Sequence, residues 1–178
     1  SVGTSILTTL SVAQGERWPL SDQAPYLGTP FIYILAASYR LFGASLEVTQ
    51  VVTCVLGALG VIPTYLLGRE VAGRAAGIVA ALLLATSPAH TVITSHVSWV
   101  HSLTPLFATV TLWLLVRGAL RNDPRAFYGG AFFLGLSLQT HPTVLPLLGG
   151  ALGAAFVVSH WARSRRQLAL IGVCALLG

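Results

Sequence analysis

The side chains that could act on a substrate fall into two groups in this sequence. One group lies near the N-terminus and the other lies in polar stretches between apolar runs: Glu16, Arg17, Asp22 and Tyr26, then His90, His96, His101 and His141. Carboxylates and imidazoles are the usual groups for general acid–base catalysis. Ionisable groups kept at membrane depth often mark substrate sites, because burying them there is costly. A solvated loop residue is the simpler interpretation of each, and these residues alone indicate no particular reaction.

The spacing of these residues does not favour a metal or redox centre. His96 and His101 are five positions apart, so one helix would not place both on one face as zinc ligands. Cys54 and Cys174 lie in separate apolar runs, which argues against a disulfide between them. The sequence contains no phosphate-binding loop or catalytic triad. No cofactor is therefore evident, although a divalent metal is left open.

The longest charge-free stretch determines how the candidate groups are positioned. Ala75 to Val116 contains no Asp, Glu, Lys or Arg, and Arg74 and Arg117 flank it. At ~1.5 Å per residue, its length is about twice what one crossing of a ~30 Å hydrocarbon core requires. The stretch therefore predicts a helical hairpin, with its turn among the polar residues from Ser87 to Pro105.

The composition predicts an all-α fold, a polytopic transmembrane helical bundle. Hydrophobic residues make up 54% of the chain and charged residues only 8%, whereas a soluble domain carries about a quarter charged residues. All the basic residues are arginines, and they cluster at the ends of apolar runs. Because this clustering is a membrane-topology signal, the net charge of +5 does not indicate binding to nucleic acid.

The apolar runs divide the chain into two parts. Residues 1–47 are expected to form an exoplasmic first-loop segment with an amphipathic helix at Ser5–Gly15 and an interfacial helix at Pro30–Gly43. A span from Ala24 to Gly43 is the competing interpretation of the second helix. Residues 48–178 are expected to form the transmembrane bundle, with these spans: 48–68, 75–90, 104–117, 126–139, 143–161 and a truncated span at 167–178. We therefore expect the chain to be a fragment of a longer protein.

The arginine loops predict how this bundle is oriented. Two hairpins separate three such loops, so all three lie on one side of the membrane, which the positive-inside rule makes the cytoplasm. We expect a prokaryotic plasma membrane, with the histidine-bearing turns outside. Asp123 before Pro124 predicts a helix N-cap followed by proline in the first turn.

Five stretches carry a resemblance to a known family. They are YLGTPFIY at 26–33, RLFGAS at 40–45, YLLGREVAGR at 65–74, ALLLATSP at 81–88 and GLSLQTHP at 135–142. In their order and spacing they resemble the N-terminal membrane region of the C-type-fold glycosyltransferases. This group includes the protein O-mannosyltransferases and the aminoarabinose transferases.

The resemblance implies an enzyme that moves a sugar from a polyprenyl-phosphate carrier to a lipid, protein or glycan acceptor outside the cytoplasm. An acidic residue of the first exoplasmic loop would assist the acceptor, and basic or polar groups would hold the developing phosphate charge. The acidic pair of the family would lie just before Ser1, so we expect the given chain alone to be inactive. His141 stands where some relatives carry lysine, and could face a phosphate.

The resemblance also implies which residues face a substrate and what the partners are. The candidates for contact with substrate or phosphate are Glu16, Arg17, Asp22, Tyr26, His96, His101 and His141, and none of them is assigned to a metal. The expected partners are the lipid bilayer, the lipid-linked sugar donor and an acceptor of unknown identity. A transporter or permease fragment and a non-catalytic scaffold subunit are the alternative functions. A transporter predicts ionisable residues inside the spans, whereas here they lie at the ends of spans.

Overall fold

The computed structural model describes residues 2–16, 18–20, 29–95, 100–141, 144–146, 149–150 and 153. Its elements are the α-helices α1 (Val2–Gln14), α2 (Pro30–Phe42), α3 (Leu46–Leu59), α4 (Val61–Ala85), α5 (Pro88–Ser95), α6 (Thr104–Arg121) and α7 (Pro124–Thr140), and the 3₁₀ helix η1 (Val100–Leu103). This part of the chain contains no strand, as the predicted all-α class requires. The predicted spans at 143–161 and 167–178 lie almost wholly outside the described residues.

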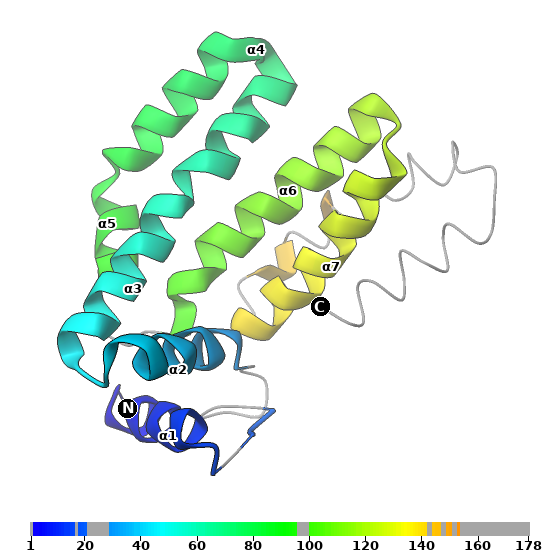
Figure 1. Ribbon diagram of the computed structural model, residues 1–178. Coiled ribbons are helices and arrows are strands. Elements are labelled where there is room, and N and C mark those ends of the chain that lie inside the picture. Colours follow the sequence, from blue (N-terminus) through cyan, green and yellow to red (C-terminus); the bar gives the residue numbers. More distant parts are fainter. Residues whose placement is uncertain are drawn as a thin grey trace.

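Helix α3 and the first part of α4 form one arm of a hairpin, and the rest of α4 forms the other arm (Figure 1). The backbone leaves helical geometry at Ala72 and Gly73, and Gly73 has a φ of 86°, which favours glycine. The arms before and after this turn pack closely, since a Cβ on Gly68 would lie 2.9 Å from the Cα of Gly77. A straight helix would separate these two residues by about 13 Å, because each residue rises ~1.5 Å. The second arm of α4 therefore runs antiparallel to the first.

The same hairpin gives the strongest membrane signal among the described residues. Leu46–Ala85 is the one helical stretch there that is long and apolar enough to cross a membrane, with a mean hydropathy of 2.0. Much of its apolar surface is not covered by the protein, since Leu82 and Leu83 are 58% and 66% exposed. Exposed apolar surface of this extent indicates contact with lipid or with further protein.

Helices α6 and α7 form a second hairpin (Figure 1). Asn122 ends α6 in the left-handed conformation, with a φ of 52°. The Asp123 carboxylate accepts hydrogen bonds from the backbone N–H groups of Arg125 and Ala126, and Pro124 occupies the first turn of α7. These contacts confirm the N-cap predicted from the sequence.

Helix α2 lies across the end of both hairpins, and α1 lies on its far side (Figure 1). The buried residues of α2 follow two adjacent stripes at a spacing of four, which are Phe31, Leu35 and Tyr39, then Ile32 and Ala36. The first stripe packs against Leu103 of η1, and the second packs against Val12 of α1. Helix α2 is therefore the middle layer between α1 and the hairpins.

One helix start differs from the sequence-based expectation, and another agrees with it. Helix α1 begins at Val2, before the expected Ser5. Thr29 has a φ of −106° and a ψ of 15°, so it is not helical, and α2 starts only after it. The competing helix from Ala24 to Gly43 is thus not continuous. At ~1.5 Å per residue, α2 is about 20 Å long, shorter than a hydrocarbon core.

The polar stretch after the second arm of α4 also differs from expectation. We expected a turn there, but α5 continues to Ser95, so Thr91 and Thr94 are helical. The hydroxyl oxygen of Ser87 accepts a hydrogen bond from the backbone N–H of His90 at 3.3 Å and so starts this helix. Helices α6 and α7 likewise extend past the predicted spans at 104–117 and 126–139. The membrane boundaries themselves stay predictions.

Candidate functional site

The two ends of the helical bundle differ in chemistry. One end carries the arginine-rich turns, within α4 and between α6 and α7. The opposite end carries α2, η1 and the C-terminus of α7, which contact one another (Figure 1). The candidate site is this second end, because the predicted substrate-facing residues that the structure describes belong to it.

The N-terminal part of α2 holds the start of the first loop. Tyr33 Oη donates a hydrogen bond to the carbonyl oxygen of Pro19 at 2.7 Å, and Thr29 Oγ1 donates to the same oxygen at 3.2 Å. The rings of Trp18 and Tyr33 stack, with their centroids 6.2 Å apart. Pro19 and Thr29 are thereby brought together at the N-terminal end of α2.

Arg40 joins α2 to the C-terminus of α1. Its Nε donates a hydrogen bond to the carbonyl oxygen of Ala13 at 2.6 Å, and its Nη2 donates to that of Val12 at 3.2 Å. The last carbonyl groups of a helix lack partners within the helix and carry partial negative charge, which an arginine stabilises. Arg40 belongs to the helix that the sequence predicted to be interfacial. Its partner, the end of α1, could not be read from the sequence.

Buried hydroxyl groups connect the helices beneath α2. Tyr39 Oη and Thr49 Oγ1 lie 2.5 Å apart and join α2 to α3. Thr104 Oγ1 donates a hydrogen bond to Thr140 Oγ1 at 3.0 Å and joins the start of α6 to the end of α7. Such bonds satisfy hydroxyls that the packing removes from water, and they recur between helices in membranes. The bond between Thr104 and Thr140 fixes the position of the residue just before His141.

His141 is the C-cap of α7 and is half-buried. Its backbone is extended, with φ −167° and ψ 144°, and its N–H donates to the carbonyl oxygen of Ser137 at 3.4 Å. The preceding residue, Thr140, is 1% exposed and bonded to Thr104. His141 is therefore held at the α2 end of the bundle, where α7 stops.

His90 takes part in helix packing. Its Nε2 lies 3.1 Å from the carbonyl oxygen of Gly57 and so joins α5 to α3. A Cβ on Gly57 would lie 2.4 Å from the Cβ of Thr94, which is one turn further along α5. His90 therefore has a role in packing α5 against α3, although the sequence had placed it among the functional candidates.

The other predicted site residues are only partly described. Glu16 is exposed just after α1, and His101 belongs to η1. The remaining candidates lie outside the described residues, namely Arg17, Asp22, Tyr26 and His96. Within the described part of the chain, no group of three or more His, Cys, Asp or Glu side chains could hold a metal ion.

An ion-pair cluster at the opposite end was not predicted. The Glu70 side chain is 3% exposed, and its carboxylate lies 2.8 Å from Arg121 Nε and 3.5 Å from Arg117 Nη1. Arg117 Nε also lies 3.7 Å from the carboxylate of Asp123. The cluster holds the two basic turns side by side. The available sequence signal was Glu70 itself, the one acidic residue within the basic loop at 69–74.

Comparison with known proteins assigns the chain to a family. The family model of the dolichyl-phosphate-mannose-protein mannosyltransferases matches residues 28–178, which include every helix from α2 onwards. No curated protein and no solved structure matches the chain significantly. The family match covers well over half of the sequence and agrees with the resemblance to C-type-fold glycosyltransferases. The chain therefore belongs to the dolichyl-phosphate-mannose-protein mannosyltransferase family of membrane glycosyltransferases.

Proposed function

We propose that the protein transfers a sugar from a polyprenyl-phosphate-linked donor to a lipid, protein or glycan acceptor on the exoplasmic face of a membrane. The observation that carries this proposal is the family match over residues 28–178. Mannose is the first sugar to test, because the family is described by its mannosyltransferase activity. The acceptor class is left open between the three.

The proposed topology is multi-pass, with the arginine-rich turns in the cytoplasm and the α1–α2 layer outside. Two features support it. The Glu70 cluster groups the basic turns of both hairpins at one end of the bundle. Helix α2, too short for a crossing, lies across the other end as an interfacial helix would (Figure 1). This arrangement follows the positive-inside rule and would place the donor sugar outside.

In this proposal His141 binds the phosphate group of the donor. Transfer of the sugar leaves negative charge on the phosphate, and a hydrogen-bond donor held rigidly near that charge stabilises the transition state. The hydroxyl pair of Thr104 and Thr140 supplies the rigidity, since it fixes the residue before His141. Glu16, Arg17, Asp22, Tyr26, His96 and His101 are the further candidates for contact with donor or acceptor.

The proposal is tested by transfer of radiolabelled mannose from a polyprenyl-phosphate donor in membranes that contain the full-length protein. His141→Ala should lower kcat by about 100-fold, the usual effect of removing one such donor. His141→Gln keeps an N–H donor and should retain part of the activity. His160→Ala is the matched control, because the predicted topology places His160 near the cytoplasmic side.

Two results would contradict the proposal. Unchanged transfer by His141→Ala would remove the role given to His141. If the folded wild-type protein transfers no sugar from any lipid-linked donor tried, the proposed enzymatic activity would be contradicted. The transporter or scaffold interpretation would then be favoured.

A further inference from the structure

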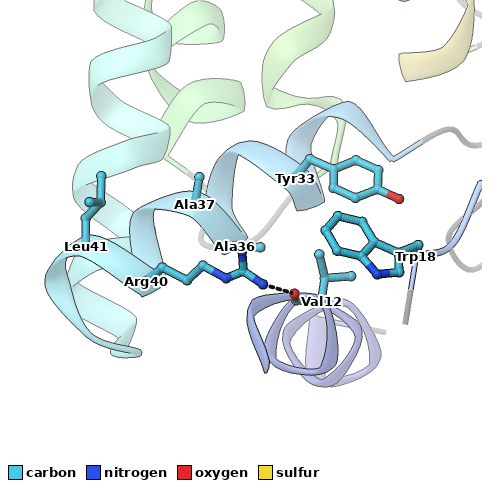
Figure 2. A pocket seen from close by; sticks show the side chains of 7 residues that line it. All are labelled: Val12, Trp18, Tyr33, Ala36, Ala37, Arg40 and Leu41. Carbon is cyan, nitrogen blue, oxygen red and sulfur yellow. Dashed lines mark hydrogen bonds between the residues drawn. The ribbon is translucent and has the colours of Figure 1, made fainter. Parts of the chain in front are cut away.

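A groove between α1 and α2 is not used by the proposed reaction. It has a volume of about 380 Å³ and is lined by Val12, Trp18, Tyr33, Ala36, Ala37, Arg40 and Leu41. Figure 2 shows the stacked Trp18 and Tyr33 rings on one side, Leu41 on the other, and the Arg40 guanidinium between them against α1. The walls are apolar or aromatic, and Arg40 supplies the charge.

The groove results from small residues on α2. Ala36 packs against α1 and is 3% exposed, whereas Ala37, the next residue, is exposed. Neither side chain fills the space between the two helices as a larger residue would. A volume of this size is at the lower end of the range of about 300–1,000 Å³ for small-molecule sites. It therefore accommodates one narrow apolar chain and is too small for a helix.

Among the described residues, no carboxylate pairs with the charge at the groove. Arg40 uses Nε and Nη2 to bind two backbone carbonyl groups, which carry no net charge. The ion pairs of the described residues involve Arg117 and Arg121, and none of them includes Arg40. A guanidinium has further N–H groups that can bind a phosphate. An anionic group beside Arg40 would complete the site.

The surface around the groove is also apolar. Trp18 is 65% exposed, Leu41 is 76% exposed, and Phe42 after it is 74% exposed. Tryptophan, tyrosine and arginine next to exposed apolar side chains are typical of the level at which lipid headgroups meet acyl chains. An apolar chain attached to a phosphate is the ligand that matches all these features.

We propose that the groove between α1 and α2 binds one acyl chain of an anionic membrane phospholipid, with its phosphate beside Arg40. The bound lipid would fix α1 and α2 at the membrane surface. This site is separate from the proposed reaction and requires no sugar transfer, so either proposal can fail while the other holds.

Fluorescence quenching of Trp18 tests the proposal directly. The full-length protein, with Trp18 as its only tryptophan and the others changed to phenylalanine, is reconstituted with phospholipids that carry bromine on the acyl chains. Brominated phosphatidylglycerol should half-quench Trp18 at about fivefold lower mole fraction than brominated phosphatidylcholine, the ratio expected for one arginine at an anionic surface.

Three variants show whether the groove is responsible. Arg40→Gln should remove the preference for the anionic lipid, and Arg40→Lys should keep it even if the contact with α1 weakens. Ala37→Phe fills the groove and should reduce quenching by both lipids. Arg69→Gln is the matched charge control at the other end of the bundle, and it should leave the preference unchanged.

Several outcomes would overturn the proposal. Equal quenching by both lipids would show that the groove does not select an anionic headgroup. A preference that survives Arg40→Gln would assign the selectivity to another residue. Release of quenching by a short polyprenyl phosphate at equal concentration would make the occupant a polyprenyl carrier and not a phospholipid.

Discussion

The carboxylate of Glu70 accepts a hydrogen bond from Arg121 Nε at 2.8 Å, although 51 positions separate the two residues in the chain. Arg117 approaches the same carboxylate at 3.5 Å. This contact ties the turn within α4 to the last turn of α6. Glu70 is thus the point at which the two hairpins are joined at their basic ends.

Glu70→Ala should therefore lower the stability of the protein. Removing one partner of a fully buried pair costs about 3–5 kcal/mol, but Arg117 and Arg121 are 34% and 55% exposed, so we expect about 1–2 kcal/mol. Thermal unfolding in detergent measures the change. Glu47→Ala, an exposed acid at the start of α3, is the control and should change stability less. Equal effects of the two substitutions would show that Glu70 contributes no more than a surface charge.

Gly77→Ala should weaken the first hairpin. A Cβ at this position would lie 2.6 Å from the carbonyl oxygen of Tyr65, a backbone atom that cannot move aside without shifting the helix. Overpacking of this kind costs about 1–3 kcal/mol. The same unfolding measurement applies. Gly129→Ala is the matched control, because its nearest contact is the Leu114 side chain at 3.4 Å. A neutral Gly77→Ala would mean that the two arms are not packed as closely as described.

Tyr39 and Thr49 should be energetically coupled. Their hydroxyl groups bond at 2.5 Å, and Tyr39 is only 6% exposed. A double-mutant cycle of Tyr39→Phe and Thr49→Val should give a coupling free energy of about 1 kcal/mol, as for one buried hydrogen bond. The unfolding free energies of the two single variants and the double variant measure it. If the two substitutions have additive effects on the unfolding free energy, the hydrogen bond contributes nothing. Only apolar packing would then hold α2 against α3.

Cysteine labelling should reveal which end of the bundle faces outward. With Cys54 and Cys174 replaced by alanine, an impermeant thiol reagent added outside should label Ser98→Cys and Ala44→Cys. It should not label Asn122→Cys until the membrane is permeabilised. The reverse pattern would place the histidine-bearing turns in the cytoplasm and invert the proposed topology.

Local sequence signals predicted much of the helical framework. Pro30 and Asp123-Pro124 marked helix starts, and α2 and α7 begin there. Both helices have proline in the first turn, where its missing N–H is not needed, and α7 is also capped by the Asp123 carboxylate. Polar composition misled at α5, where Thr91 and Thr94 suggested a turn. Each hydroxyl instead bonds to the backbone carbonyl one turn earlier, so both residues remain compatible with a helix.

Contacts between distant residues were not predictable in the same way. Arg40 was expected at an interface, but nothing in its neighbourhood in the sequence indicated the carbonyl groups of Ala13 and Val12, 27 and 28 positions away. The role of Glu70 depends on how two hairpins dock, which one sequence does not determine. The candidate site was predicted as a set of polar residues at one end, and the substrate contacts proposed for it await the transfer assay.

The shared hydrogen-bond acceptor at Pro19 has a consequence for how this family member could diversify. Because Thr29 and Tyr33 both bind that one carbonyl oxygen, the two ends of the intervening segment are anchored independently of its length. Doubling the length of a closed loop costs only about 0.6 kcal/mol of additional closure entropy. Insertions between Pro19 and Thr29 could therefore change the segment that carries Asp22 and Tyr26, two residues proposed to contact substrate, while the helices keep their packing. New acceptor preferences could evolve there without a new fold.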